Sequence, residues 1–286
     1  MVTSAARAMP DAMELAIAFQ SAGFELALVG GSVRDLILAR PITDLDFTTN
    51  ATPQQINEVV KSWADAIWDV GIAFGTVGVR RNDFKAEITT YRSEIYRDES
   101  RKPEVSFGST LEADLVRRDF TINALAVRLP ELEFVDLFDG VSDLSRKLIR
   151  TPREPELSFS DDPLRMMRAA RFASQLGFTP VVDLLIAATD MAQRIEIVSA
   201  ERIRDEFNKL IMGEFPTAGL EILDGTKLSD YIIPELPALQ LEIDEHHKHK
   251  DVYEHSLIVL QQAIALESTH QPQLEPDLVL RLAALL

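Results

Sequence analysis

Two aspartates two positions apart form the first pattern in this sequence that is suited to chemistry. Asp44 and Asp46 alternate with the apolar residues Leu45 and Phe47. In a β-strand this alternation turns the apolar pair to the core and both acids to the other face, roughly 7 Å apart at their backbones. Paired carboxylates suit a hard cation such as Mg²⁺, which can bridge a triphosphate and activate an attacking hydroxyl. We therefore predict that Asp44 and Asp46 are catalytic metal ligands, with a solvated strand edge as the alternative.

A pair of glycines precedes these acids and favours the catalytic interpretation. Gly30 and Gly31 stand between an apolar run at 24–29 and a helix-like run at 32–38. A turn of this kind lets a phosphate approach backbone amides, so we expect Gly31 to bind a triphosphate together with Arg34. The alternative is a tight turn with a solvated arginine. Neither a Walker loop nor the Gly-x-Gly-x-x-Gly dinucleotide fingerprint occurs in the sequence.

A second cluster reads Arg-Arg-Asp-Phe-Thr-Ile-Asn-Ala at 117–124. A guanidinium suits a phosphate or a base, and a carboxylate can accept hydrogen bonds from ribose hydroxyls. We therefore predict that Arg118 and Asp119 bind a nucleotide. A helix start with a local ion pair is the alternative.

A third cluster, Asp-Asp-Pro-Leu-Arg at 161–165, places carboxylates and a guanidinium at the expected start of a helix. We expect Pro163 to be the first helical residue, Asp162 to cap the helix, and Arg165 to lie on neighbouring surface. A carboxylate only accepts and a guanidinium only donates, so the pair fits the edge that cytosine and adenine share. Uracil and guanine present a carbonyl where the amino group is needed. An ordinary cap with a surface ion pair is the alternative.

Together these motifs resemble those of the DNA polymerase beta-like nucleotidyltransferases. The segments 29–35, 41–46 and 117–124 are similar to one branch, the bacterial CCA-adding tRNA nucleotidyltransferases and their poly(A) polymerase relatives. Segment 161–165 resembles the Glu-Asp-x-x-Arg motif of that branch, with aspartate in place of the glutamate. The resemblance also implies that Arg168 and Arg171 line the nucleotide pocket.

The activity implied by the resemblance is Mg²⁺-dependent, template-independent transfer of CMP and AMP from CTP and ATP to the 3′ end of tRNA. A poly(A) polymerase on the same fold is one alternative. A non-catalytic RNA-binding or HD regulatory module is another.

The expected fold is an α/β head, with a polymerase beta-like mixed sheet and helices, followed by an all-α neck and body. We predict a nucleotidyltransferase head at 1–149, a helical neck at 150–243 and the start of an HD-type body at 244–286. Segment 85–92 alternates like a strand, and its Glu87 is a candidate third metal ligand. Segment 93–107 is polar and is expected to form a mobile loop near the site.

The end of the sequence indicates a truncated chain. Residues 183–223 have a helical pattern, 244–250 are expected to form a polar linker, and 278–286 read as an apolar helix without a cap. No His-Asp doublet occurs, so HD hydrolase activity is unsupported. We therefore expect truncation at the start of the HD-type domain.

Composition sets the outer limits. The chain has 286 residues, of which 46% are hydrophobic, and no cysteine, which excludes disulfides and thiolate metal sites. With neither a signal sequence nor a long uncharged span, we predict a cytoplasmic protein without a membrane partner. The net charge of −17 disfavours diffuse attraction to RNA, so local arginine clusters would have to form a positive cleft.

Overall fold

The computed structural model describes residue 3 and residues 9–42, 45–71, 75–95, 104–107, 110–241, 252–270 and 276–286. The chain splits into two compact units, one comprising Met1–Arg146 with Thr151–Arg153 and the other Lys147–Arg150 with Glu154–Leu286. The predicted division into head, neck and body stays a prediction.

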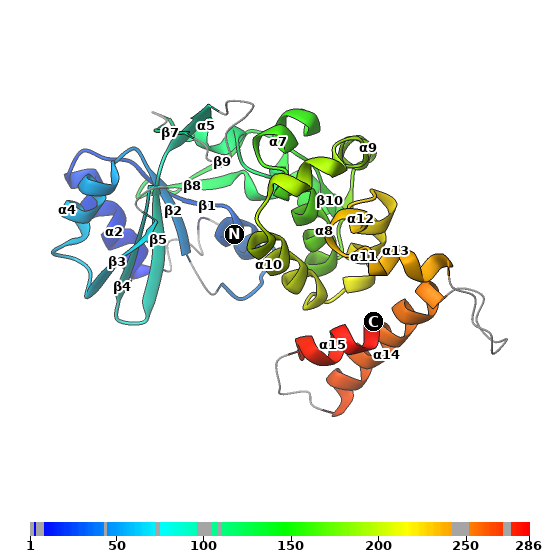
Figure 1. The fold of residues 1–286 in the computed structure, drawn as a ribbon. Helices are drawn as coiled ribbons and strands as arrows, with labels where there is room; N and C mark the ends of the chain where they lie inside the picture. Colours follow the sequence, from blue (N-terminus) through cyan, green and yellow to red (C-terminus); the bar gives the residue numbers. More distant parts are fainter. Residues whose placement is uncertain are drawn as a thin grey trace. The chain divides into compact units, whose positions relative to one another are not determined.

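The first unit is built around a sheet of seven strands (Figure 1). Its strands are β1 Leu26–Val29, β2 Leu45–Thr49, β3 Ala66–Gly71, β4 Thr76–Arg81, β5 Phe84–Thr90, β8 Leu125–Leu129 and β9 Glu133–Asp136. Its helices are α2 Pro10–Ser21, α3 Gly31–Ile37, α4 Pro53–Val60, α5 Leu111–Val116, the 3₁₀ turn η2 Thr121–Asn123 and α6 Gly140–Arg146.

The strand order is β3-β4-β5-β2-β1-β8-β9. All described neighbours in this sheet pair antiparallel except β2 and β5, which are parallel. The sheet is therefore mixed, as predicted. The two strands that carry Asp46 and Glu87 are direct neighbours at its centre.

Helix α5 packs on the middle of this sheet. Its Leu111 and Leu115 belong to a buried cluster with Ala27 and Val29 of β1 and with Ala126 of β8. Successive strand residues point to opposite faces, so Leu26 and Leu28, which are also buried, face the other side of the sheet. Strand β1 is thus covered on both faces, which explains its continuous apolar sequence.

The segment at 93–107 differs from the predicted loop. Strands β6 Arg92–Ile95 and β7 Glu104–Phe107 form an antiparallel two-stranded sheet directly after β5. The prediction of a loop was wrong for these two strands, because the polar composition obscured their alternation. Residues 96–103 lie outside the described part of the chain.

The second unit is helical apart from the short parallel pair β10 Leu148–Ile149 and β11 Thr179–Pro180. Its helices are α7 Pro155–Asp161, α8 Leu164–Leu176, α9 Val182–Asp190, η3 Ala192–Ile197, α10 Ala200–Ile211, α11 Pro216–Gly225, α12 Ser229–Ile232, α13 Glu235–Ala238, η4 Leu239–Leu241, α14 Val252–His270 and α15 Leu278–Leu285. The predicted fold class, an α/β unit followed by helices, is confirmed.

Helices α14 and α15 form the C-terminal part of this unit and contact each other (Figure 1). Contrary to the expectation of an uncapped helix, Asp277 caps α15 and accepts hydrogen bonds from the amides of Val279 and Leu280. The predicted linker at 244–250 lies outside the described residues. Among the residues that the structure describes, none of the helices has the length and apolar character needed to cross a membrane.

Candidate active site

The glycine turn connects β1 to α3. Gly30 has φ of 70° and ψ of −134°, a conformation that strongly favours glycine. Its amide donates to the carbonyl of Leu125 at 3.1 Å, and α3 begins at Gly31. A Cβ atom placed on Gly30 would lie 2.8 Å from Nη1 of Arg118. The predicted strand, diglycine and helix are confirmed, and the Arg118 guanidinium lies against the turn.

Arg34 links this turn to the 117–124 motif. Its Nε and Nη2 donate to the carboxylate of Asp35 at 2.9 Å each, and its Nη1 donates to Oδ1 of Asn123 at 2.8 Å. Asn123 in turn donates to Oδ1 of the buried Asp119 at 3.0 Å. The structure therefore brings together four of the residues singled out from the sequence, Gly31, Arg34, Arg118 and Asp119. Their contacts with a nucleotide stay a prediction.

A buried carboxylate orients the two arginines of the motif. Asp114, only 1% exposed, accepts from Nη2 of Arg117 at 3.0 Å and from Nε and Nη2 of Arg118 at 3.3 and 3.0 Å. Burial alone would raise the pKa of Asp114, but the Arg118 and Arg117 guanidiniums outweigh it and hold the pKa below its ordinary value. Asp114 is therefore ionised at neutral pH.

The carboxylate strand lies beside the glycine turn. Strand β2 begins at Leu45, and the amide of Asp46 donates to Oγ of Ser32 in α3 at 3.0 Å. Asp46 is exposed and is paired in parallel register with Glu87 of β5. Paired residues on neighbouring strands face the same side, about 4.8 Å apart at their backbones.

The oxygen donors of Asp46 and Glu87 fit a hard cation. Within the described residues there is no group of three or more His, Cys, Asp or Glu that could hold a metal ion. Asp44 lies outside the described residues, so the metal-ligand roles of Asp44, Asp46 and Glu87 stay predictions.

The 161–165 segment lies in the second unit, where Asp162 precedes α8. Its Oδ1 accepts from the amide of Leu164 at 3.1 Å, and its Oδ2 accepts from Nη2 of Arg202 in α10 at 2.8 Å. Helix α8 begins at Leu164, one residue later than expected, and Pro163 is its N-cap. Asp162 thus stabilises the start of α8 from the position before the N-cap residue.

Arg165 and Arg171 point to different partners. Arg165 is 8% exposed and donates through Nη1 to the hydroxyl and carbonyl of Ser158 in α7, at 2.8 and 3.4 Å. Nε of Arg171 lies 2.8 Å from Oε2 of the buried Glu206 in α10. Arg168 and Arg171 both stand over the ring of Phe172, at 5.9 and 4.3 Å from its centroid.

Leu164, Met167 and Phe172 of α8 are all buried. The roles of Asp162, Arg165, Arg168 and Arg171 in binding a nucleotide stay predictions. Asp162 and Arg171 contact Arg202 and Glu206, which are one turn apart on the same helix, α10.

Several residues of this arrangement were given no role from the sequence: Ser32, Asp114, Asn123, Arg202 and Glu206. Asp114 precedes Arg117 and Arg118 by three and four positions, which is the spacing of ion pairs on a helix, so this pairing could have been found. The contacts of Ser32 and Asn123 depend on the tertiary fold and have no local signal.

The sequence matches two protein families. The family described as the poly A polymerase head domain covers residues 26–150, and the one described as the probable RNA and SrmB- binding site of polymerase A covers residues 177–239. Two similar curated proteins are the CCA-adding enzymes of Pediococcus pentosaceus and Lactobacillus helveticus. They are 41% and 44% identical to 84% and 78% of this chain, which spans 59% and 56% of their lengths.

Solved structures show the same similarity. The Bacillus stearothermophilus CCA-adding enzyme in complex with CTP matches with a TM-score of 0.70 and 37% identity, over 78% of this chain and 53% of that one. A tRNA nucleotidyltransferase complexed with a primer tRNA and an incoming ATP analog matches with a TM-score of 0.71 and 25% identity. That match covers all of this chain and 75% of the other.

Proposed function

Because this chain belongs to the family of tRNA nucleotidyltransferases and poly(A) polymerases, we propose that it is a template-independent CCA-adding enzyme. It would transfer CMP and AMP from CTP and ATP to the 3′ end of tRNA. The observation that carries the proposal is the Gly30–Gly31 turn, which lies against Arg118 and is joined through Ser32 to the backbone of Asp46. A cytoplasmic location stays a prediction.

In the proposed site the first unit binds the triphosphate and sugar. The backbone at Gly31 and the guanidiniums of Arg34 and Arg118 face the phosphates. Amide and guanidinium groups form strong hydrogen bonds with anionic phosphate oxygens. The carboxylate of Asp119 accepts from the ribose hydroxyls. The 3′ hydroxyl of the tRNA attacks the α-phosphorus, and the bond to pyrophosphate breaks.

Enzymes of this family depend on a metal ion, and we infer that Mg²⁺ serves here, held by Asp44 and Asp46 with Glu87 alongside. When bound, it neutralises phosphate charge and lowers the pKa of the attacking hydroxyl. The exposure of Asp46 and its pairing with Glu87 support this assignment, because both carboxylates are placed to offer oxygen ligands on one face of the sheet.

Base selection is assigned to the second unit. Asp162 accepts from the amino group of cytosine or adenine, and Arg165 donates to the adjacent ring nitrogen or carbonyl. Uracil and guanine would set a carbonyl against the Asp162 carboxylate, at a cost of about 1–3 kcal/mol. The contact of Asp162 with Arg202 at 2.8 Å supports the proposal, because it holds the carboxylate in one orientation.

The test presents the chain with Mg²⁺, a tRNA lacking its CCA end and each nucleoside triphosphate in turn. We expect CTP and ATP to bind and to be incorporated, and UTP and GTP to be refused. Asp46→Asn should abolish incorporation, whereas Asp83→Asn, in the exposed turn between β4 and β5, should leave it unchanged.

Two outcomes would contradict the proposal. Long tails made from ATP without use of CTP would identify a poly(A) polymerase, the activity in the description of the family that matches residues 26–150. Binding of RNA with no selective binding of CTP and ATP would identify a non-catalytic RNA-binding module.

A further inference from the structure

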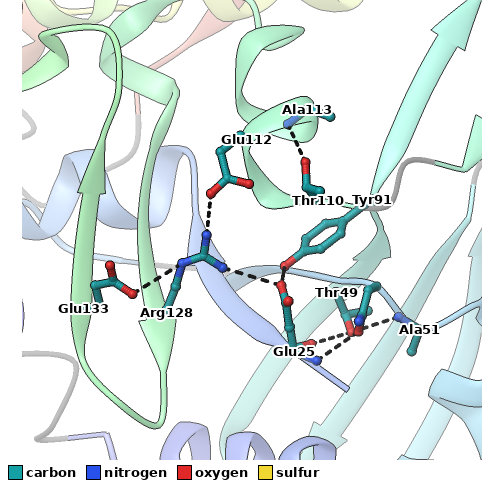
Figure 2. Close-up of polar contacts among 10 residues, drawn as sticks. Glu25, Thr49, Ala51, Tyr91, Thr110, Glu112, Ala113, Arg128 and Glu133 are labelled. Carbon is teal, nitrogen blue, oxygen red and sulfur yellow. Dashed lines mark hydrogen bonds and ion pairs between the residues drawn. The ribbon is translucent and has the colours of Figure 1, made fainter. Parts of the chain in front are cut away.

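Arg128 of β8 stands at the centre of a group of carboxylates in the first unit (Figure 2). Its Nη2 donates to Oε1 of Glu112 at 2.5 Å, its Nη1 to Oε2 of Glu25 at 3.5 Å, and its Nε lies 3.5 Å from Oε2 of Glu133. The hydroxyl of Tyr91 donates to the same Glu25 oxygen at 2.9 Å. These five residues are called the Arg128 cluster below.

The cluster reaches the beginning of helix α5 through Glu112. This helix has six residues, too few to be stable without support from its surroundings. Its amide at Ala113 is capped by the hydroxyl of Thr110 at 3.2 Å (Figure 2). Apart from its apolar face, the position of α5 therefore depends on contacts at its two ends.

The other end of α5 carries the residues assigned to the nucleotide. Asp114, in the middle of the helix, fixes Arg118, which lies against Gly30. Arg118 lies two residues beyond the end of α5, and its amide donates to the carbonyl of Leu115 at 3.2 Å. A displacement or rotation of the helix at Glu112 is therefore transmitted to the guanidinium at the glycine turn.

Tyr91 connects the cluster to the carboxylate strands. It directly follows β5, its amide donates to the carbonyl of Thr49 at the end of β2 at 2.7 Å, and its side chain is fully buried. Its ring lies in the same apolar cluster as Leu111 and Leu115 of α5. Burial, reinforced by the hydrogen bond to Glu25, raises the pKa of Tyr91, so its hydroxyl remains a donor to Glu25 throughout the neutral range.

The backbone of Glu25 is itself fixed. Its amide donates to Oδ1 of Asn50 at 2.9 Å, and its carbonyl accepts from the hydroxyl of Thr49 at 2.5 Å. Figure 2 shows Glu25 between the phenol of Tyr91 and the guanidinium of Arg128. A continuous path of hydrogen bonds therefore runs from the ends of β2 and β5 through Glu25 and Arg128 to α5.

We propose that Tyr91, Glu25 and Arg128 are positioning residues that hold α5 in register with the carboxylate strands and so place Arg118 at the glycine turn. The inference rests on the proposed function, because it assigns a nucleotide to Arg118. Glu25 and Glu112 are half exposed, with 51% and 50% of their side chains accessible. Exposed ion pairs contribute little to global stability, so the effect of the cluster falls on the placement of α5.

The experiment is a double-mutant cycle on CTP affinity in the whole chain. Arg128→Met is combined with Arg118→Met, and the CTP dissociation constant is measured with Mg²⁺ for all four proteins. We expect Arg128→Met to weaken CTP about fivefold in the wild-type background and to have no further effect once Arg118 is replaced. Tyr91→Phe, which removes only the hydroxyl, should show the same dependence on Arg118 with a smaller effect.

Arg81 offers a matched control in the same unit. It is about as exposed as Arg128, at 30% against 26%, and it also pairs with carboxylates, those of Glu14 and Asp11. Arg81→Met should leave the CTP dissociation constant unchanged. Amide hydrogen exchange over residues 111–118, measured without nucleotide, should accelerate in Arg128→Met and not in Arg81→Met.

Hydrogen exchange and CTP affinity distinguish a failure of the proposed function from a failure of the proposed coupling between Arg128 and α5. Accelerated exchange in α5 together with no CTP binding by the wild-type chain would overturn the proposed function and leave the coupling of Arg128 to α5 intact. Unchanged exchange, or a loss of affinity that is equal in both backgrounds of the cycle, would overturn the inference.

Discussion

Replacing Gly30 by alanine tests whether the glycine turn and Arg118 act together. The new Cβ would lie 2.8 Å from Nη1 of Arg118. An ordinary contact needs 3.5–4.0 Å, so the guanidinium would have to move by roughly 1 Å. A long side chain can make this movement at little cost to folding. The arginine would, however, no longer stand where the triphosphate is expected.

Two magnitudes follow for Gly30→Ala. The backbone at φ 70° and ψ −134° is unfavourable for alanine, and holding it there should lower the free energy of unfolding by about 1–3 kcal/mol. The expected hydrogen bond between Arg118 and the triphosphate joins charged groups, and such a bond contributes about 1.5–3 kcal/mol. Loss of this bond should raise the CTP dissociation constant by roughly ten- to a hundredfold.

Gly23→Ala is the matched control. Gly23 also has a positive φ, 83°, and a Cβ there would meet no heavy atom within 4 Å. It should lose about 1 kcal/mol of stability and keep its affinity for CTP. The CTP dissociation constants of the two variants are compared by calorimetric titration with CTP and Mg²⁺. The temperature is kept below the unfolding temperature of either variant. Equal dissociation constants for Gly23→Ala and Gly30→Ala would refute the assignment of Arg118 to the triphosphate.

Asp114→Asn should lower the free energy of unfolding at neutral pH by about 3 kcal/mol, because two guanidiniums lose a buried anion. The pKa of Asp114 in the folded chain lies below its ordinary 3.8, so this contribution is present above that value and is lost as the pH falls through the folded pKa. Urea unfolding of both proteins should show the difference narrowing in acid, and a constant difference would contradict the assignment. The pKa of Tyr91 is raised, so its contribution is complete below its ordinary 10.0 and is lost as the pH rises through the folded pKa. Tyr91→Phe should therefore be less stable by about 1 kcal/mol near neutrality, and this deficit should shrink in alkaline urea titrations. Asp162→Asn should reduce the preference for CTP over UTP by about tenfold in binding assays, because the amide of asparagine can donate to the uracil carbonyl. Asp183 is an exposed carboxylate in the first turn of α9, and Asp183→Asn should leave the preference for CTP over UTP unchanged. An equal preference in the two variants would argue against base reading by Asp162.

The first half of the candidate site could be predicted because its signals are local. A buried strand, two glycines and a helix start follow one another in the sequence, and the structure has β1, the Gly30 turn and α3 in that order. The alternation of Asp46 with its apolar neighbours likewise predicted a strand, and the structure has strand β2 at Leu45–Thr49. Such patterns depend on the period of the backbone and need no knowledge of tertiary contacts.

The partners of the arginines could not be predicted in the same way. The side chain of Arg165 donates to Ser158, seven positions earlier, and nothing in the local sequence signals this contact. Its joint action with Asp162 on a base stays a prediction. Glu206, the partner of Arg171, is 35 positions away and lies on another helix. Which arginine faces solvent and which is buried depends on helix packing, and the helical period alone leaves that open.

Boundary errors have local causes. Helix α8 begins at Leu164 because Asp162 reaches the Leu164 amide directly. The apolar helix at the C-terminus has a cap in Asp277, which the preceding run of polar residues concealed. Polar composition also concealed β6 and β7, whose pairing with each other gives them extended structure.

The single parallel pair in the central sheet affects how the carboxylate site can form. Asp46 and Glu87 are about forty residues apart along the chain, and β3 and β4 lie between their strands in the sequence. Pairing of such distant segments is slow compared with local contacts. No local hairpin can bring the two acids together, because parallel neighbours require a crossover connection. During synthesis, Asp46 is therefore made well before Glu87, the acid that faces it on the neighbouring strand. Binding of Mg²⁺ by the proposed pair of acids should consequently appear late in refolding, once β5 lies beside β2.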